Sequence, residues 1–565
     1  MNRIKNKRYI AYFCASLFSL IWSSSKGQTN SDDKRFNEQI TIVGEYTPHI
    51  IDANKININP TIKEKEWLNT VDEFEPIAKK APTSIELQTL QPMTIRFDRT
   101  AESWNNYLKA GIGTYLNPYV EFFHNGPQEN DFSYGIHAKH HSSNLKIDGY
   151  DNSTFSDNLL EGQIQKNFTN HTLNVNAYYQ RKGLSYYGAY VDSPFSFKVD
   201  EDSLKQAINY TGVALDFSNF SEDEEAFRYK IKGEYNFTFD KFAAKEHNIN
   251  IGADLNKRFY IFDFSDGETI GLKLNAESYI NSNLNLDSTS SNIKVEPYIN
   301  LKYEMFNFYA GLNLNFVNGA ENSFYFYPNL RAEMEIIPKS MVLYAGLKGE
   351  LKRSSFKELT NVNPYISSLS PLAWTNNKMD FFGGVNGNLF ETVDYNVQVS
   401  FNMFDNMPLY VQDTTYYLDA PFVPLYDNIK RFRVAGELSY HINKTADISA
   451  NFKYNAYSTD NEEEAWQLPV TELGLNVNVY PIEKLTLNLS VDSKGKVPYK
   501  TIVNKDVVSK QIDNWTDISI GGAYNITDQI SAFVQANNLL NNKYQLWQNY
   551  PVHGINFMVG GAYRF

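Results

Sequence analysis

The sequence predicts an all-β fold: a transmembrane, antiparallel up-and-down β-barrel of about 22 strands, preceded by an extended N-terminal periplasmic arm. Segments of alternating apolar and polar residues recur from Asn106 to Phe565. Very short and much longer connections alternate between these segments. Tyr (39) and Phe (38) are abundant while only 21% of residues are charged, a composition suited to an apolar, lipid-facing surface around a polar interior.

The composition excludes several classes of protein. Hydrophobic residues make up 42% of the chain and the mean hydropathy is -0.45. Past residue 30, no apolar run approaches the roughly 18 to 20 residues that a membrane-spanning helix needs, so a helical bundle is excluded. With 52 basic and 65 acidic residues, the chain is not expected to bind nucleic acid. We find no motif typical of an active site, and predict no enzyme, catalytic residue, metal site or cofactor.

The first element is a predicted signal peptide over residues 1–27. A basic N-terminus precedes the apolar stretch Tyr9–Trp22, small residues follow it, and we place cleavage after Gly27. The single cysteine, Cys14, lies inside this peptide. The mature chain is therefore expected to have no disulfide bond and no thiol chemistry.

The second element is the periplasmic arm, residues 28–105. Asn, Asp, Lys and Pro are scattered there among short apolar runs, and no period is sustained. One β-prone run, Ile40, Thr41, Ile42 and Val43, resembles a TonB box, the segment by which the inner-membrane energy transducer TonB captures receptors through strand addition. The alternatives are a strand that pairs elsewhere and an arm that binds another periplasmic protein.

The third element is the barrel, residues 106–565. In Met305–Val317, Phe306 begins an apolar face and Asn307 a polar face, the apolar-out, polar-in pattern of a membrane barrel. The pattern is sustained over some 460 residues, more than a single soluble core accommodates. The predicted strands are 106–116, 118–125, 131–141, 157–168, 171–182, 206–219, 227–240, 246–256, 268–280, 290–303, 305–317, 323–336, 339–352, 377–389, 391–406, 430–443, 445–458, 467–481, 483–494, 515–526, 528–540 and 556–565.

The lengths of the connections predict the topology. Turns as short as Thr169-Asn170 and Glu304 alternate with longer connections, of which the longest are 183–205, 353–376, 407–429, 495–514 and 541–555. Short turns belong in the periplasm and long loops outside the cell, so both ends of the barrel segment are predicted to face the periplasm. The alternation holds only if Leu145–Tyr150 is a loop.

The last predicted strand carries the most specific signal. Phe557, Val559, Tyr563 and Phe565 share one face because successive side chains of a strand alternate. Upstream stand Phe533–Tyr544 with its Asn-Asn-Leu-Leu run, then Trp547, Tyr550-Pro551 and Gly554. Together these residues resemble the C-terminal end of TonB-dependent outer-membrane receptors. In that family the final aromatic strand is also read by the barrel-assembly machinery, so the resemblance implies this role for the four residues.

The resemblance covers the barrel and has one departure. Twenty-two is the strand number of outer-membrane transporters with plugged lumens. Receptors of the family carry a folded plug before the barrel that is longer than the 78 residues from Gln28 to Asn105. We therefore expect a plug-less TonB-dependent-receptor-like barrel, and what fills its lumen stays open.

Two polar groups are candidate metal sites with simpler interpretations. Five histidines fall in the first five predicted strands: His124, His137, His140, His141 and His171. Strand residues four apart, such as His137 and His141, are about 13 Å from each other, too far to share one metal ion. We interpret the histidines as polar residues of the lumen or loops. The acidic run Asp460–Glu464 is either a solvated loop or a site for Ca²⁺ or for divalent ions that bridge lipopolysaccharide.

Aromatic residues crowd the predicted outer loops. They are Tyr365, Trp374, Tyr410, Tyr416, Tyr417, Phe422, Tyr426, Trp547 and Tyr550. Such rings either stack on sugars or anchor a partner, or they form the girdle at the lipid interface.

The leading functional hypothesis is a receptor or transport barrel of the Gram-negative outer membrane for a solute too large for general porins. The alternatives are a structural or assembly component of an outer-membrane complex and an open diffusion channel. The expected partners are outer-membrane lipid, the barrel-assembly machinery, TonB or another periplasmic protein, and a surface lipoprotein.

Overall fold

A computed structural model describes residues 104–565, apart from residues 115, 127–130, 145–146, 148–149, 151–152, 189–200, 285–286, 414–420, 443 and 504–505. The predicted signal peptide and nearly all of the predicted arm, including Ile40, Thr41, Ile42 and Val43, lie outside the described residues.

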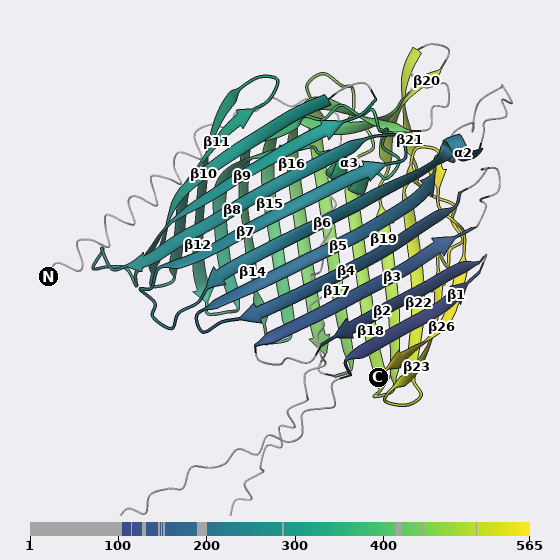
Figure 1. The fold of residues 1–565 in the computed structure, drawn as a ribbon, viewed down its shortest axis with the longest axis horizontal. Helices are drawn as coiled ribbons and strands as arrows, with labels where there is room; N and C mark the ends of the chain where they lie inside the picture. The colour runs from purple at the N-terminus through teal and green to yellow at the C-terminus, as the bar shows by residue number, and fades with distance from the viewer. Residues whose placement is uncertain are drawn as a thin grey trace, which may run out of the picture.

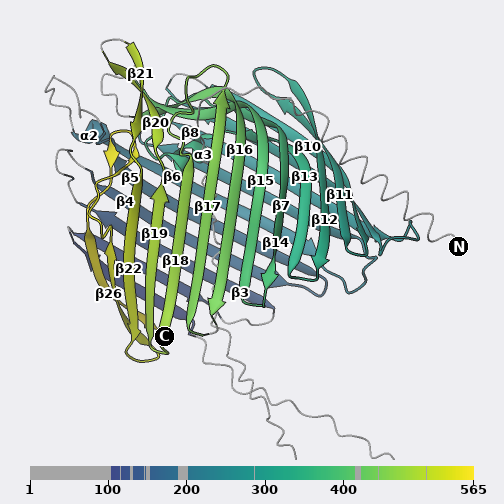
Figure 2. The same ribbon diagram turned by 180° about the vertical axis from the view of Figure 1, so that it is seen from behind.

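The described chain forms one closed antiparallel sheet of 22 strands (Figures 1 and 2). Successive barrel strands pair with each other, and β1 pairs with β26 to close the barrel. The barrel strands are β1 (Asn106–Gly113), β2 (Asn117–Asn125), β3 (Phe132–Ser143), β4 (Phe155–Asn167), β5 (His171–Ser185), β6 (Lys205–Asn219), β7 (Arg228–Asp240), β8 (Lys245–Phe259), β9 (Glu268–Ser282), β10 (Asp287–Tyr303), β11 (Phe306–Asn318), β12 (Ser323–Ile337), β13 (Met341–Arg353), β14 (Trp374–Leu389), β15 (Val393–Gln412), β16 (Phe422–Ile442), β17 (Ala446–Thr459), β18 (Thr471–Ile482), β19 (Leu485–Lys494), β22 (Trp515–Asn525), β23 (Ile530–Asn537) and β26 (Asn556–Arg564).

Short elements lie in the connections. The strands β20 (Val497–Val503) and β21 (Asp506–Ile512) form a separate two-stranded sheet, as do β24 (Gln545–Trp547) and β25 (Tyr550–Pro551). The helices are α2 (Glu201–Leu204) and α3 (Phe356–Val362). Within the described part of the chain, no helix is long and apolar enough to cross a membrane.

All 22 predicted strands overlap a barrel strand, so the predicted fold class is confirmed. The largest difference is in 407–429, which was predicted to be a loop. Its two ends instead lengthen β15 and β16 into a tall hairpin, with pairing that continues from Met407 to Gln412. The reason is packing: Leu409 and Phe422 are fully buried against other loops, which stabilises the strands beyond the membrane.

The predicted alternation of connections is also confirmed. The start of β1 and the end of β26 lie at one end of the barrel, which we call the turn end, together with turns such as 338–340 and 483–484. The long connections meet at the opposite end, which we call the loop end. The alternation required that Leu145–Tyr150 is a loop. The described residues of this segment, Ile147 and Tyr150, and the preceding Asn144 do not belong to a strand. In outer-membrane barrels the end with long loops faces the outside of the cell.

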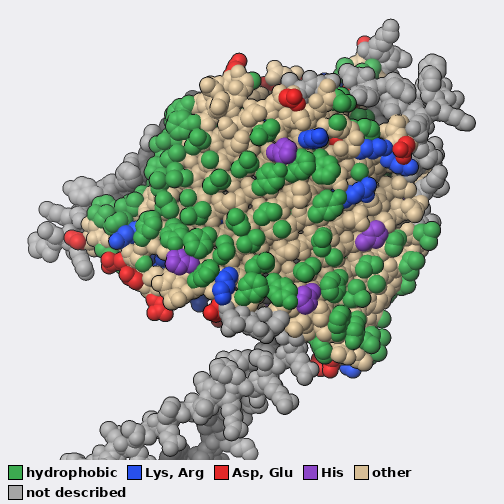
Figure 3. Space-filling model, in the orientation of Figure 1, with side chains coloured by type: hydrophobic (Ala, Val, Ile, Leu, Met, Phe, Trp, Pro, Cys, Tyr) green, Lys and Arg blue, Asp and Glu red, His purple; other side chains and the backbone are tan. Residues whose placement is uncertain are grey.

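The two faces of the wall differ as the alternation predicted. On β11, Leu312 and Phe316 are 43% and 48% exposed on the outer face, whereas Asn313 and Asn315, on the inner face, are 3% and 1% exposed. Apolar side chains spread over the outer wall and charged ones are sparse (Figure 3). The outer wall therefore suits lipid and the inner wall suits water or a polar solute.

Candidate functional site at the loop end

The connection from β13 to β14, residues 354–373, which we call the β13–β14 loop, crosses to the inner face of β6–β8. Ser355 caps the N-terminus of its helix α3, and the Ser355 side chain accepts a hydrogen bond from Glu358 N (3.2 Å). The Glu246 carboxylate of β8 accepts two more, from Phe356 N (2.7 Å) and Lys357 N (3.1 Å). Because the first amide groups of a helix have no partner within it, these bonds hold α3 against the wall.

Side chains of α3 reinforce this attachment. Tyr210 of β6 donates to the Thr360 hydroxyl (3.0 Å), and Lys357 Nζ donates to Asn236 Oδ1 of β7 (2.7 Å). Tyr210 is 2% exposed and Thr360 fully buried. Strands β6–β8 thus hold a loop that connects β13 with β14.

The second half of the loop pairs with β16. Ile366 forms an isolated parallel bridge with Phe422. Ser367 N donates to Phe422 O, and Phe422 N donates to Tyr365 O, each at 2.8 Å. Tyr186, which follows β5, donates its hydroxyl to Ile366 O (3.1 Å). The β13–β14 loop therefore connects β5, β16 and its own strands across the mouth of the barrel.

An apolar cluster of several connections fills the loop end, and we call it the loop core. Tyr365 stacks on Tyr550 with ring centroids 3.7 Å apart, and Phe422 contacts both Tyr550 (5.9 Å) and Trp547 (5.6 Å). Trp466 is fully buried in the same cluster. Burial raises the pKa of the Tyr365 and Tyr550 hydroxyls, so both side chains stay neutral.

The loop core changes the interpretation of the loop aromatics. Tyr365, Tyr410, Phe422, Trp547 and Tyr550 belong to it, so they serve neither as an exposed stacking surface nor as a lipid girdle. Tyr426 donates its hydroxyl to Pro371 O (2.9 Å), and Trp374 lines a cavity described below. Tyr416 and Tyr417 lie outside the described residues. The sequence did not reveal this cluster because its members come from connections far apart in the chain.

The acidic run Asp460–Glu464 is a loop whose residues Asp460, Asn461 and Glu463 are exposed, as interpreted from the sequence, whereas Glu464 is buried. The buried Asp427 carboxylate accepts hydrogen bonds from Asn461 N and Glu462 N (3.1 and 2.9 Å). Glu462 in turn accepts from Trp466 Nε1 (2.6 Å) and Lys500 Nζ (2.8 Å). No group of metal-ligating residues occurs among the described residues.

The histidines lie on both faces of the wall. His137 faces the lumen, stacks on Phe123 (4.1 Å) and contacts Glu121 (3.1 Å). His140, by contrast, shares a register position with the lipid-facing Val120, and His171 stacks on Phe217 (5.5 Å). The interpretation as lumen or loop residues is therefore wrong for His140 and His171, and also for His124, which pairs with the exposed Ile136 on the outer wall.

The lumen wall below the loop core is a network of neutral and charged polar groups. Glu296 of β10, 2% exposed, accepts from the Tyr309 hydroxyl (2.7 Å) and Asn329 Nδ2 (2.9 Å). Lys273 and Lys294 each lie 3.6 Å from its carboxylate. Such a wall offers both donors and acceptors to a polar solute.

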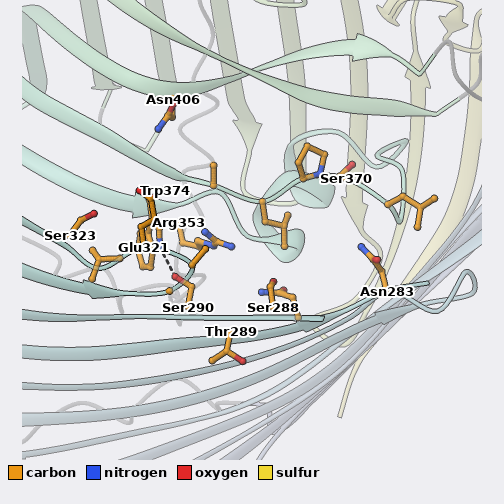
Figure 4. A pocket seen from close by; sticks show the side chains of 18 of the residues that line it. Asn283, Ser288, Thr289, Ser290, Glu321, Ser323, Arg353, Ser370, Trp374 and Asn406 are labelled. Atoms are coloured by element: carbon orange, nitrogen blue, oxygen red, sulfur yellow. Dashed lines mark hydrogen bonds between the residues drawn. The ribbon is translucent and has the colours of Figure 1, made fainter. Parts of the chain in front are cut away.

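Two cavities adjoin the β13–β14 loop. The larger one, of about 580 Å³, lies between the end of this loop and the loop ends of β9–β12 (Figure 4). The second, of about 430 Å³, adjoins α3 and the inner wall of β8–β10 and β13, including Lys273, Glu277 and Glu358. Arg353 lines both. Both volumes fall within the range of small-molecule sites.

Three of the predicted assembly-signal residues lie on the outer face of β26, and the fourth, Phe565, directly follows this strand. Phe557, Val559, Tyr563 and Phe565 are 46%, 54%, 41% and 44% exposed. Tyr563 and Phe565 stack with ring centroids 5.0 Å apart. Their placement on the lipid-facing side agrees with the strand periodicity, and their role in assembly stays a prediction.

Comparison with known proteins shows which solved structures share this fold. No protein-family model matches the sequence, and no curated protein matches it significantly. Among solved structures, the Pseudomonas aeruginosa receptor FpvA bound to pyoverdine superposes with a TM-score of 0.63 at 12% identity, covering 82% of this chain and 72% of that one. The chain therefore has the barrel fold of this receptor.

Two further solved structures agree with this assignment. The ferric-catecholate import receptor Fiu from Escherichia coli K12 gives a TM-score of 0.61 at 9% identity, covering 82% of each chain. The FrpB iron transporter from Neisseria meningitidis gives 0.63 at 10% identity, again with 82% of each chain covered. At these identities the likeness establishes the fold, and the ligands in those names belong to those proteins.

Proposed function

We propose that this protein is an outer-membrane receptor that binds a solute at its loop end and moves it through the barrel lumen. The observation that carries this proposal is the combination of a receptor-type 22-stranded barrel with an outer mouth occupied by its own packed loops. Passage then depends on movement of the β13–β14 loop. An open diffusion channel is disfavoured by the same observation.

The neighbouring structures support transport over catalysis. Their names describe an import receptor and an iron transporter. We extend to this chain the general activity, solute import, and not the iron-containing ligands.

The coupling to TonB is tested in the predicted arm. Ile42→Pro removes one backbone donor and fixes φ, which prevents strand addition. We expect this variant to lose co-purification with TonB, while the barrel still assembles and the outer membrane stays impermeable. Thr47→Pro, a few residues beyond the run, is the matched control and is expected to retain co-purification with TonB.

Deletion of 28–100 separates the remaining functions of the arm. Loss of co-purification with TonB at unchanged permeability supports a coupling segment. A large conductance in planar bilayers, with sensitivity to bulky antibiotics, means that the arm fills the lumen. If neither co-purification with TonB nor permeability changes, the arm is dispensable and TonB coupling through the arm is refuted.

A second candidate, a component of a larger outer-membrane complex, is favoured by β20–β21. This hairpin forms its own sheet and exposes Ile502 (51%) and Val507 (56%), an apolar surface suited to a surface lipoprotein. Ile502→Asp with Val507→Asp should release such a partner while leaving solute binding unchanged. If the double variant loses solute uptake but still co-purifies with a lipoprotein, the result argues for a receptor and against a component of a larger complex.

A further inference from the structure

The cavity of about 580 Å³ contains buried polar side chains whose hydrogen-bonding capacity is unused. Asn281 of β9, Arg353 of β13 and Ser370 of the β13–β14 loop are 8%, 7% and 6% exposed, and all three line the cavity. Within the described residues, both Oδ1 and Nδ2 of Asn281, Nε of Arg353 and Oγ of Ser370 have no hydrogen-bond partner. Buried polar groups normally have partners, so these atoms are available to bind water or a ligand in the cavity.

We propose that this cavity binds a neutral, polyhydroxylated solute, a saccharide in the simplest case. A hydroxyl group donates and accepts, which matches a free amide that presents one acceptor and one donor side by side. Both amide atoms of Asn281 lack partners, so reversing the amide orientation does not change this requirement. Ser370 Oγ adds a group that either donates or accepts, and Arg353 Nε adds a donor.

The aromatic wall of the cavity fits the same class of ligand. Trp374 lies at the start of β14, and its indole Nε1 donates to Ser290 Oγ at 2.7 Å (Figure 4). Tyr279 packs edge-on against it with ring centroids 5.9 Å apart. The indole is thus held in one orientation, and a fixed ring offers a large contact area to the apolar face of a sugar at low entropic cost.

The charges around the cavity argue against an anion. Arg353 is the single cation among the residues that line it, and its guanidinium carbon lies 5.6 Å from the Trp374 ring centroid. Glu321, from the β11–β12 connection, lines the cavity as well and is exposed. A phosphate or carboxylate would meet this acidic group and would leave Asn281 Oδ1 without a donor.

The cavity is lined in part by the β13–β14 loop, which lies across the mouth of the lumen. Ser370 and Leu372 belong to the loop that also carries α3, and Arg353 separates this cavity from the second one below. A solute bound here contacts the segment that must move for passage. This inference names the solute class of the proposed receptor and in that sense rests on the proposed function, but binding itself does not require transport.

The experiment measures binding to the purified, full-length barrel in detergent. The probes are a panel of neutral mono- to trisaccharides, with inorganic phosphate and citrate as anionic probes. Isothermal titration calorimetry measures the binding of each probe. We expect neutral saccharides to bind and the anions not to bind. Asn281→Leu, which keeps the size and removes both polar atoms, should weaken binding by about tenfold or more, and Ser370→Ala should weaken it by a smaller factor.

Asn388→Leu, at the turn end of β14, is the matched control and should bind like the wild type. Heat-modifiable migration on gels verifies that each variant is folded. Binding of anions alone, no binding of any probe, or saccharide binding that is unchanged in Asn281→Leu would each overturn the inference. If saccharides bind and TonB coupling is absent, the site stands and the transport proposal fails; if coupling is present and saccharides do not bind, the reverse holds.

Discussion

At the residue scale, Glu246 illustrates how a single carboxylate can position a loop. It is 2% exposed and accepts the first two amide groups of α3 from 110 and 111 residues away in sequence. Hydrogen bonds to a charged acceptor are stronger than neutral ones, and a buried carboxylate without them would be costly. Glu246 therefore stabilises the closed position of the β13–β14 loop only while α3 is docked.

Replacing Glu246 by Gln tests this role. The amide keeps the size of the side chain but loses the charge, so we expect docking of α3 to weaken by about 1–3 kcal/mol. Hydrogen exchange of the amide groups in 356–362, measured by mass spectrometry, should speed up accordingly. Glu437→Gln on β16, where the side chain is exposed, is the control, and equal exchange in both variants would contradict the assignment.

At the scale of elements, strands and loops differed in how well they could be predicted. The alternation in Met305–Val317 is a local property, because a strand against lipid must be apolar on one face whatever its neighbours are. The positions of Tyr365 and Tyr550, whose rings stack at 3.7 Å, depend on two loops that are separated by eight barrel strands along the chain. No local period encodes such a contact, which is why the loop core and the cavity containing Asn281 were missed.

The β13–β14 loop gives the corresponding prediction for an element. Replacing 356–368 by a Gly-Ser linker of equal length removes α3 and Ile366, and with them the contacts to β5–β8 and β16. We expect larger single-channel conductance in planar bilayers, since flexible linkers do not hold a packed position.

The same replacement in the 220–227 connection at the turn end is the control for this experiment. It should leave the conductance unchanged. A β13–β14 loop variant that conducts like the wild type would mean that other segments close the lumen, with the arm as the first to examine.

At the scale of the whole molecule, closure of the barrel depends on β26. This strand pairs with β23 on one side and with β1 on the other, so its insertion completes the hydrogen bonding that a membrane requires of every strand. The outward side chains of β26, ending in Phe565, are the part that lipid and the assembly machinery meet.

Phe565→Asp tests the importance of this outer face. A charge near the lipid interface costs little to about 1 kcal/mol by itself, so a strong loss of assembled barrel in the outer membrane would point to recognition by the assembly machinery. We expect such a loss in heat-modifiability assays. Arg564→Gln alters the preceding, inward-facing position and should assemble normally; normal assembly of Phe565→Asp would contradict the predicted signal.

The unequal heights of the strands have a consequence for the surrounding membrane. β1 has 8 residues and β26 has 9, whereas β15 and β16 have 20 and 21. Tilted by about 45°, an eight-residue strand spans about 19 Å, less than the apolar band of about 25 Å that such barrels present to lipid. Lipids next to the β1–β26 seam must shorten or tilt to match it. We therefore expect a thinner bilayer on one side of the protein, beside the β1–β26 pair.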